Sequence, residues 1–218
     1  MPERKGPDIG KLYSRLAPVY GFWGAMTERR ARERALAVSE LKAGESVLEV
    51  ATGTGTFLAQ LAAVPGLANV VGVDLAEGMT SRAHELLKSK LVARAVLARA
   101  DARRLPFADG SFDVLLNCYM LDLLPERDIS NVLAEFRRVL KPGGRLVALV
   151  MACQARIFNS LWMRLYRISP ALVGACRPIP LAEFLVRGSW QVTMREMISQ
   201  CGFRSELIVA QPAAGGNS

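Results

Sequence analysis

Two acidic residues and a pair of glycines are the first residues of the chain whose types and spacing could do chemistry. Glu49 precedes Gly53 and Gly55 in the stretch VLEVATGTGT, and Asp74 ends the next apolar stretch, VVGVD. Glycine lets the backbone approach a ligand closely. A carboxylate at the end of a buried strand can accept hydrogen bonds from the hydroxyl groups of a ribose. Glu49 would repel a phosphate and attract an ammonium, so the pattern predicts a site for a phosphate-free, positively charged nucleoside.

A dinucleotide is the main alternative ligand for a glycine turn of this kind. The dinucleotide fingerprint G-x-G-x-x-G needs a small third residue, and this chain has Leu58 at that place. S-adenosylmethionine carries an ammonium, a ribose and an adenine but no phosphate, so its groups match the order acid, glycines, acid. We therefore expect S-adenosylmethionine as the cofactor, and a nicotinamide oxidoreductase is the alternative that Leu58 disfavours.

The stretch E-V-A-T-G-T-G-T and the later phrase EFRRVLKPGGRLV resemble the class I S-adenosylmethionine-dependent methyltransferases. The first stretch is close to the version found in menaquinone/ubiquinone C-methyltransferases, and the resemblance extends over roughly residues 11–150. It implies an enzyme that moves a methyl group from S-adenosylmethionine to an acceptor. The residues expected to contact the cofactor are Tyr20, Glu49, Ala51, Thr52, Gly53, Thr54, Gly55, Asp74, Leu75, Met79, Asp101, Ala102 and Asn117.

Several of these contacts depend on the resemblance and carry an alternative. The phrase R-x-A-P-V-Y resembles the N-terminal lid of the quinone methyltransferases, where a tyrosine, here Tyr20, lies over the sulfonium or the substrate. The same aromatic residues could instead pack a helix against the sheet. The resemblance also implies that Met79 contacts the adenine, although a methionine in the core is the simpler explanation. Asp101 would accept a hydrogen bond from the amino group of adenine, with Ala102 and Leu105 beside its ring.

The segment after the fourth predicted strand supplies the candidate catalytic residues. We predict Asp122 and Tyr119 as catalytic residues, and Cys118 is a further base within reach, although none has a histidine nearby in sequence. Because a methyl sulfonium is already activated, we expect positioning of the acceptor and exclusion of water to matter more than proton abstraction. The single histidine, His84, is expected on the surface, and no metal site is expected.

These residues require an α/β fold, a doubly wound and mostly parallel seven-stranded sheet with an antiparallel last strand, to bring strand ends together. Apolar runs predict strands at 47–50, 70–73, 94–99, 112–116 and 145–151, and helical spacing predicts helices at 57–64, 76–91 and 126–140. Two further runs, 190–199 and 204–210, predict a closing hairpin, although 192–200 could instead be helical. We expect one methyltransferase domain over 1–218, with lid helices at 1–40, a cofactor core at 41–151, a substrate cap at 152–190 and the terminal hairpin at 191–211.

Composition limits the class of protein. A chain of 218 residues with 51% hydrophobic content suits one α/β domain. It contains no apolar run long enough to cross a bilayer, and its four cysteines are scattered, so we expect reduced thiols and a cytoplasmic location. The net charge of +8 could serve an acidic partner, but no basic run with interleaved aromatics is present, so nucleic acid is disfavoured as a partner.

The segment 152–190 differs from the rest of the chain, with five arginines, one glutamate and neither lysine nor aspartate. Its first half reads as a basic amphipathic helix, which suits a substrate cap, a peripheral membrane contact or simple packing on the sheet. We expect a small apolar or lipid-like acceptor, of which a quinone is one form. The quinone enzymes carry Gly-Arg-Asn near the fourth strand where this chain has L-N-C-Y-M-L-D-L-L, so the acceptor stays open.

Two alternatives to that function remain from the sequence. One is a catalytically inactive module that binds S-adenosylmethionine, which the intact acidic and glycine positions disfavour. The other is an arsenite or thiol methyltransferase, because Asn117 and Cys118 resemble a pair found in arsenite methyltransferases. The oligomeric state is not indicated by the sequence.

Overall fold

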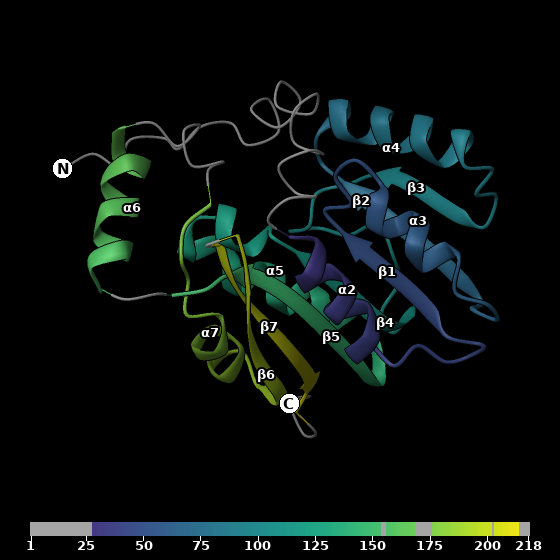
Figure 1. The fold of residues 1–218 in the computed structure, drawn as a ribbon. Coiled ribbons are helices and arrows are strands. Elements are labelled where there is room, and N and C mark those ends of the chain that lie inside the picture. The colour runs from purple at the N-terminus through teal and green to yellow at the C-terminus, as the bar shows by residue number, and fades with distance from the viewer. Residues whose placement is uncertain (1–27, 154–155, 169–175, 202, 214–218) are drawn as a thin grey trace.

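The computed structural model describes residues 28–153, 156–168, 176–201 and 203–213, and Figure 1 shows the fold. Tyr20 and most of the predicted lid lie outside the described residues. The strands are β1 (Ser46–Val50), β2 (Asn69–Asp74), β3 (Ala95–Arg99), β4 (Phe112–Cys118), β5 (Leu140–Met151), β6 (Trp190–Gln200) and β7 (Phe203–Pro212). The helices are α2 (Arg29–Val38), α3 (Thr56–Ala62), α4 (Glu77–Ser89), α5 (Glu126–Val139), α6 (Arg156–Ile168) and α7 (Leu181–Arg187), with a short 3-10 helix, η1 (Leu121–Leu123).

The strands form one sheet in the order β3-β2-β1-β4-β5-β7-β6. β1 to β5 run parallel, whereas β7 is antiparallel to β5 and β6 is antiparallel to β7. The chain extends from β1 toward β3 on one side and from β4 toward β6 on the other, so the strand order reverses between β1 and β4. Open sheets of this kind bind ligands outside the carboxyl ends of the strands at that reversal. The predicted doubly wound sheet is confirmed.

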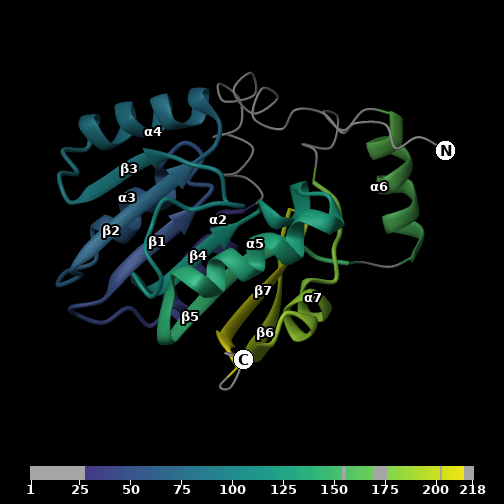
Figure 2. The ribbon, with the colours of Figure 1, turned by 180° about the vertical axis from the view of Figure 1, so that it is seen from behind.

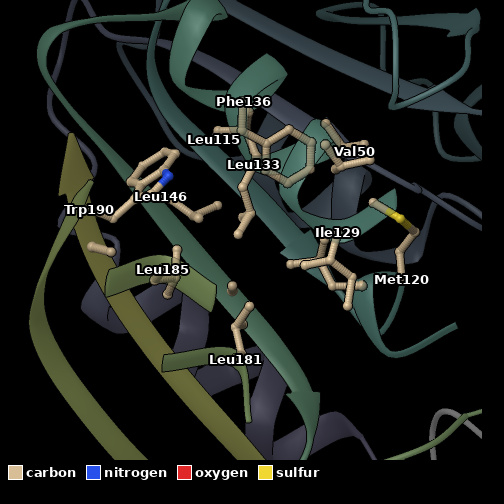
Figure 3. Close-up of a cluster of buried hydrophobic side chains, with 14 of the residues drawn as sticks. Val50, Leu115, Met120, Ile129, Leu133, Phe136, Leu146, Leu181, Leu185 and Trp190 are labelled. Atoms are coloured by element: carbon tan, nitrogen blue, oxygen red, sulfur yellow. The ribbon is translucent and has the colours of Figure 1, made fainter. Parts of the chain in front are cut away.

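Helices cover both faces of the sheet, as the two opposite views in Figures 1 and 2 show. One apolar core lies between the sheet and α5 with α7, and its members include Leu115, Phe136, Leu185 and Trp190 (Figure 3). A second core lies on the other face, where α2 and α3 pack. Because both faces are covered, all five residues of β1 are buried, the apolar Val47, Leu48 and Val50 as well as the polar Ser46 and Glu49.

The structure resolves two ambiguous segments of the sequence. The segment 192–200 is extended, because β6 pairs with β7 along its whole length. β5 begins at Leu140 and not at Arg145, since the Pro-Gly-Gly phrase forms an irregularity inside the strand: Leu140 pairs with Phe112, and Arg145 already pairs with Val114. Residues 141–144, which separate the predicted helix 126–140 from the predicted strand 145–151, therefore form a local bulge inside β5, with Gly143 at a φ of 78°.

Candidate cofactor site

The carboxyl ends of three adjacent strands lie at the same level, which brings the predicted residues together. Val50 pairs with Val73 of β2 and with Asn117 of β4. Asp74 therefore follows the Val50 level by one residue, and Glu49 precedes it by one. One edge of the sheet thus carries both acids and the amide of Asn117.

Asp74 is held in place by backbone groups on both sides. Its Oδ2 accepts a hydrogen bond from the N–H of Gly53 at 2.8 Å, and its Oδ1 accepts one from the N–H of Ala76 at 2.8 Å. Burial raises the pKa of Asp74, and the hydrogen bonds from Ala76 and Gly53 oppose that rise. Each carboxylate oxygen has a further lone pair, so the group can still accept hydrogen bonds from two ligand hydroxyls.

Glu49 is the unusual acid of the site. It is 1% exposed, and neither oxygen of its carboxyl group has a hydrogen-bond partner. The Thr52 hydroxyl donates to the backbone carbonyl of Glu49, at 3.4 Å. Burial raises the pKa of Glu49 to about 8; the positive charge of Arg32 opposes the rise and the negative charge of Asp74 adds to it. An unsatisfied buried carboxyl group is costly, so a positively charged ligand group would relieve it.

The two glycines of the turn have different structural roles. Gly53 has a φ of 59°, and a Cβ at this position would meet nothing within 4 Å, so its backbone faces open space. Gly55 has a φ of 80°, and a Cβ there would lie 2.8 Å from the Cβ of Ala83 in α4. Gly53 can therefore admit a ligand against the backbone, whereas Gly55 permits the close approach of α3 to α4.

Gly72 explains how Leu58 is accommodated, and it was absent from the predicted site. A Cβ on Gly72 would lie 2.5 Å from a methyl carbon of Leu58 and 2.6 Å from the hydroxyl oxygen of Thr52. The small residue of the strand–helix contact thus lies on β2, and the large one on α3. A glycine inside a strand pattern is the signal that could have indicated this contact.

Two residues that follow strand ends have a left-handed backbone conformation, which residues other than glycine rarely adopt. Ala51 follows β1 with a φ of 62°, and Tyr119 follows β4 with a φ of 57°. Non-glycine residues in this region are strained, and such strain concentrates at functional sites. Both lie at the edge where the strand order reverses. The neighbouring Thr52 is tied to β2 through its N–H and the carbonyl of Val73, at 3.0 Å.

The amide of Asn117 links the two central strands. Its Nδ2 donates to the carbonyl of Val50 at 2.9 Å, and its buried Oδ1 has no partner. Thr54 lies in the turn, where its hydroxyl oxygen is 3.4 Å from that of Thr56. A second buried acceptor at the edge is thus available for a ligand donor.

On the predicted adenine side of the site, Asp101 forms an ion pair that no sequence pattern indicated. Arg103 pairs with Asp101, with an Nη2–Oδ2 distance of 2.7 Å and an Nε–Oδ1 distance of 3.0 Å. Hydrogen bonds from Arg103 lower the pKa of Asp101, so this carboxylate is charged and can accept. Ala102 beside it is half-buried. Leu75, at the end of β2, is 44% exposed and Met79 is buried in the first turn of α4.

The two catalytic candidates differ in their surroundings. Asp122 lies in η1, and its Oδ2 accepts the N–H of Met151 at 2.9 Å, whereas its buried Oδ1 has no partner. Burial raises the pKa of Asp122 to about 7. The hydroxyl of Tyr119 is buried against the hydroxyl of Ser205, at 2.6 Å, and burial raises the pKa of Tyr119 well above its usual value. Asp122 is thus suited to proton transfer, and Tyr119 is suited to holding the end of β4.

These observations fit S-adenosylmethionine. The unpartnered acid at Glu49 suits an ammonium, the oriented carboxylate of Asp74 suits ribose hydroxyls, and the open backbone at Gly53 leaves room for the ligand. Nothing at these positions favours a pyrophosphate, because two acids flank the turn. His84, the single histidine, is exposed on α4, as expected. Among the described residues, no group of three side chains could hold a metal ion.

Comparisons with known proteins agree with this geometry. A family model described as a methyltransferase domain matches residues 47–144. The ubiquinone/menaquinone biosynthesis C-methyltransferase of Geobacter sulfurreducens is 32% identical over 92% of this chain and 82% of its own length. The demethylmenaquinone methyltransferase of Thermus thermophilus is 34% identical over 75% of this chain and 76% of its own.

The fold has solved counterparts as well. A SAM-dependent methyltransferase from Methanosarcina mazei superimposes with a TM-score of 0.69 over 82% of this chain and 97% of its own, at 19% identity. That likeness shows the shared fold, and the more similar relatives show the family. The chain belongs to the class I S-adenosylmethionine-dependent methyltransferases, among the relatives of the ubiquinone/menaquinone C-methyltransferases.

Proposed function

We propose that this enzyme transfers the methyl group of S-adenosylmethionine to a small apolar or lipid-like acceptor of the quinol type. The observation that carries the proposal is the similarity, over 92% of the chain, to a relative named as a ubiquinone/menaquinone biosynthesis C-methyltransferase. The cofactor supplies a methyl group already activated on a sulfonium. The residues of the chain then have three tasks: to bind the cofactor, to orient the acceptor and to accept its proton.

Asp122 is the residue that we assign to the proton. Carbon methylation of a quinol ring releases a proton, and a base beside the ring assists the reaction. Asp122 lies beyond β4 at the edge that carries the cofactor residues, and with a pKa of about 7 it is partly ionised at neutral pH. The N–H of Met151 fixes one carboxyl oxygen, so the other, Oδ1, is the one left to accept a proton.

The cysteines give no support to the arsenite alternative. Burial raises the pKa of the Cys118 thiol to about 12, so this group stays protonated at neutral pH and is a poor ligand for arsenic. Among the described residues Cys153 and Cys201 are exposed, and no triad of possible metal ligands forms. Cys118 instead packs in the core beneath α2 and α3.

The test is a methyl-transfer assay with a defined acceptor. The purified protein, S-adenosylmethionine and a chemically reduced demethylmenaquinone with a short isoprenoid chain are incubated, and mass spectrometry follows the product heavier by one CH2 group. Asp122→Asn should lower the rate about a hundredfold, the usual contribution of a positioned base. The matched control Asp109→Asn, whose carboxylate is on the surface, should leave it unchanged.

The outcomes separate the alternatives. Binding of S-adenosylhomocysteine without methylation of any quinol or arsenite would favour the inactive binding module and contradict the proposal. Methylation of the quinol at equal rates by the wild type and Asp122→Asn would support the quinol as the acceptor and would contradict the role of Asp122 as the base.

A further inference from the structure

Arg32 is a charged residue at the cofactor edge that the sequence analysis left unassigned. It extends from α2, and its Nη2 and Nε donate to one carboxylate oxygen of Glu28 at 2.8 Å and 3.3 Å. Its guanidinium carbon lies 5.9 Å from the centre of the Tyr119 ring. Tyr119 directly follows β4, so the guanidinium is located where α2 meets the carboxyl end of that strand.

The charge of Arg32 acts on the site itself. After burial, it is the largest influence on the ionisation of Glu49, the acid with two unpartnered oxygens. It also acts on Cys118 at the end of β4. The Arg32 side chain is 20% exposed and that of Glu28 is 4% exposed, so water weakens these charges little. The guanidinium of Arg32 and the unpartnered carboxyl group of Glu49 therefore lie near enough for the charge of one to act on the ionisation of the other.

The amino-acid part of S-adenosylmethionine carries groups that suit such a pair of charges. The methionine part of S-adenosylmethionine carries an ammonium and a carboxylate on one carbon atom. A carboxylate brought to a buried edge needs a cationic or hydrogen-bonding partner, and a guanidinium is the side chain best shaped for one. Glu49 can serve only the ammonium, and Asp74 would repel the carboxylate.

We propose that Arg32 binds the carboxylate of the amino-acid part of the cofactor, so that Arg32 and Glu49 together recognise a zwitterion. The inference rests on the cofactor role of this site and adds a residue to it. Glu28 has a supporting part, because its ion pair holds the guanidinium at the edge. The site thereby selects for an intact amino acid attached to the nucleoside.

The experiment removes the carboxylate from the ligand and the cation from the protein in turn. Isothermal titration calorimetry measures the binding of S-adenosylhomocysteine and of its decarboxylated analogue, S-adenosyl-3-thiopropylamine. The proteins are the wild type, Glu28→Gln, and the double variant Glu28→Gln with Arg32→Met. The double variant avoids leaving a buried glutamate without its partner. Arg34→Met, which removes an arginine of the same helix that pairs with Glu196, is the matched control.

The wild type, Glu28→Gln and Arg34→Met should each bind S-adenosylhomocysteine at least about tenfold more tightly than the decarboxylated analogue, the effect of one hydrogen-bonded charge. In the double variant the two ligands should bind within about twofold of each other. The same ratio in Glu28→Gln and in the double variant would overturn the proposal. A wild-type ratio near one would overturn it without any variant. If the wild type binds neither ligand, the cofactor site itself is refuted, and this inference with it.

Discussion

The carboxyl group of Glu49 couples the ionisation of the site to the folding of the chain. In the unfolded chain this group is hydrated, whereas in the fold burial raises its pKa from 4.5 to about 8. A raised pKa means that the folded state holds the proton more tightly. The contribution of Glu49 to stability is therefore largest below its unfolded pKa and falls as the pH rises, until its folded pKa is passed.

This coupling gives a prediction for the ligand-free protein. Between about pH 5 and about pH 8, Glu49 should contribute a loss of about 1.4 kcal/mol in the free energy of unfolding per pH unit. Asp122 contributes in the same direction up to its own pKa of about 7. Urea denaturation of the wild type and of Glu49→Gln, across this range, measures the difference in slope. Identical slopes would show that Glu49 does not hold a proton in the fold.

At the scale of residues, the sequence predicted the positions of the acids and glycines at the strand ends. It did not predict the side-chain contacts between elements that lie far apart in the chain. Glu49, Gly53 and Asp74 follow from their order along two strands, because parallel strands end at a common edge. Arg32 and Arg103 could not be predicted, since each acts through a contact with another element that no local pattern encodes. The ambiguity at Met79 persists, because a buried methionine beside a ligand and one in a core look alike.

Helix α3 and its turn illustrate how an element is positioned by single atoms. Gly55→Ala would place a Cβ 2.8 Å from that of Ala83 and force a strained backbone, whereas Gly53→Ala would strain the backbone in open space. We expect Gly55→Ala to lower the free energy of unfolding by about 3 kcal/mol or more, and Gly53→Ala by about 1–2 kcal/mol. Urea denaturation measures both. Equal losses would contradict the packing assigned to α3 and α4.

Gly53→Ala, the variant with the smaller expected loss of stability, should have a large effect on cofactor binding. A methyl group at Gly53 occupies the open space that the ligand needs, so Gly53→Ala should weaken the binding of S-adenosylhomocysteine about tenfold or more while the protein stays folded. Calorimetry provides the measurement. Unchanged affinity in Gly53→Ala would move the ligand away from this turn.

Helix α6 differs from the other helices in its position relative to the sheet. Figures 1 and 2 show that it stands away from the sheet and from α7. Ile168 at its end is 76% exposed and Leu165 is 39% exposed, beside an exposed Arg164. Within the described ranges, no helix is long and apolar enough to cross a membrane. A peripheral contact with an anionic surface stays a prediction.

Vesicle flotation tests that contact. With vesicles that contain phosphatidylglycerol, Arg164→Glu should lower the bound fraction about tenfold, because each basic residue near such a surface contributes about 1 kcal/mol. Arg187→Glu on α7, an equal change of charge at an exposed position, should have a smaller effect. Equal flotation of the wild type and Arg164→Glu would contradict a membrane contact through Arg164.

The elements themselves were predicted where one pattern dominated. The pairing of β6 with β7 agrees with the hairpin predicted from the runs 190–199 and 204–210, whereas the helical alternative for 192–200 is wrong. The bulge in β5 was not predicted, because glycine and proline indicate a turn but not whether the strand ladder continues through it.

The whole molecule places its chemistry at the point where the strand order reverses. β1 and β4 are neighbours in the sheet although helices and two strands separate them along the chain. The glycine turn after β1, the acid that ends β2 and η1 after β4 therefore share one edge. The sequence predicted this arrangement because alternating strands and helices allow few topologies. It did not predict the acceptor, because the strand order and the glycine turn position the cofactor and carry no information about the molecule that is methylated.

The central claim is that two acids at adjacent strand ends bind the cofactor. Calorimetry with S-adenosylhomocysteine, on the wild type and on the isosteric double variant Glu49→Gln with Asp74→Asn, tests it most directly. We expect the affinity to fall at least about a hundredfold, since two hydrogen-bonded charges are lost. Binding of the double variant as tight as that of the wild type would contradict the account.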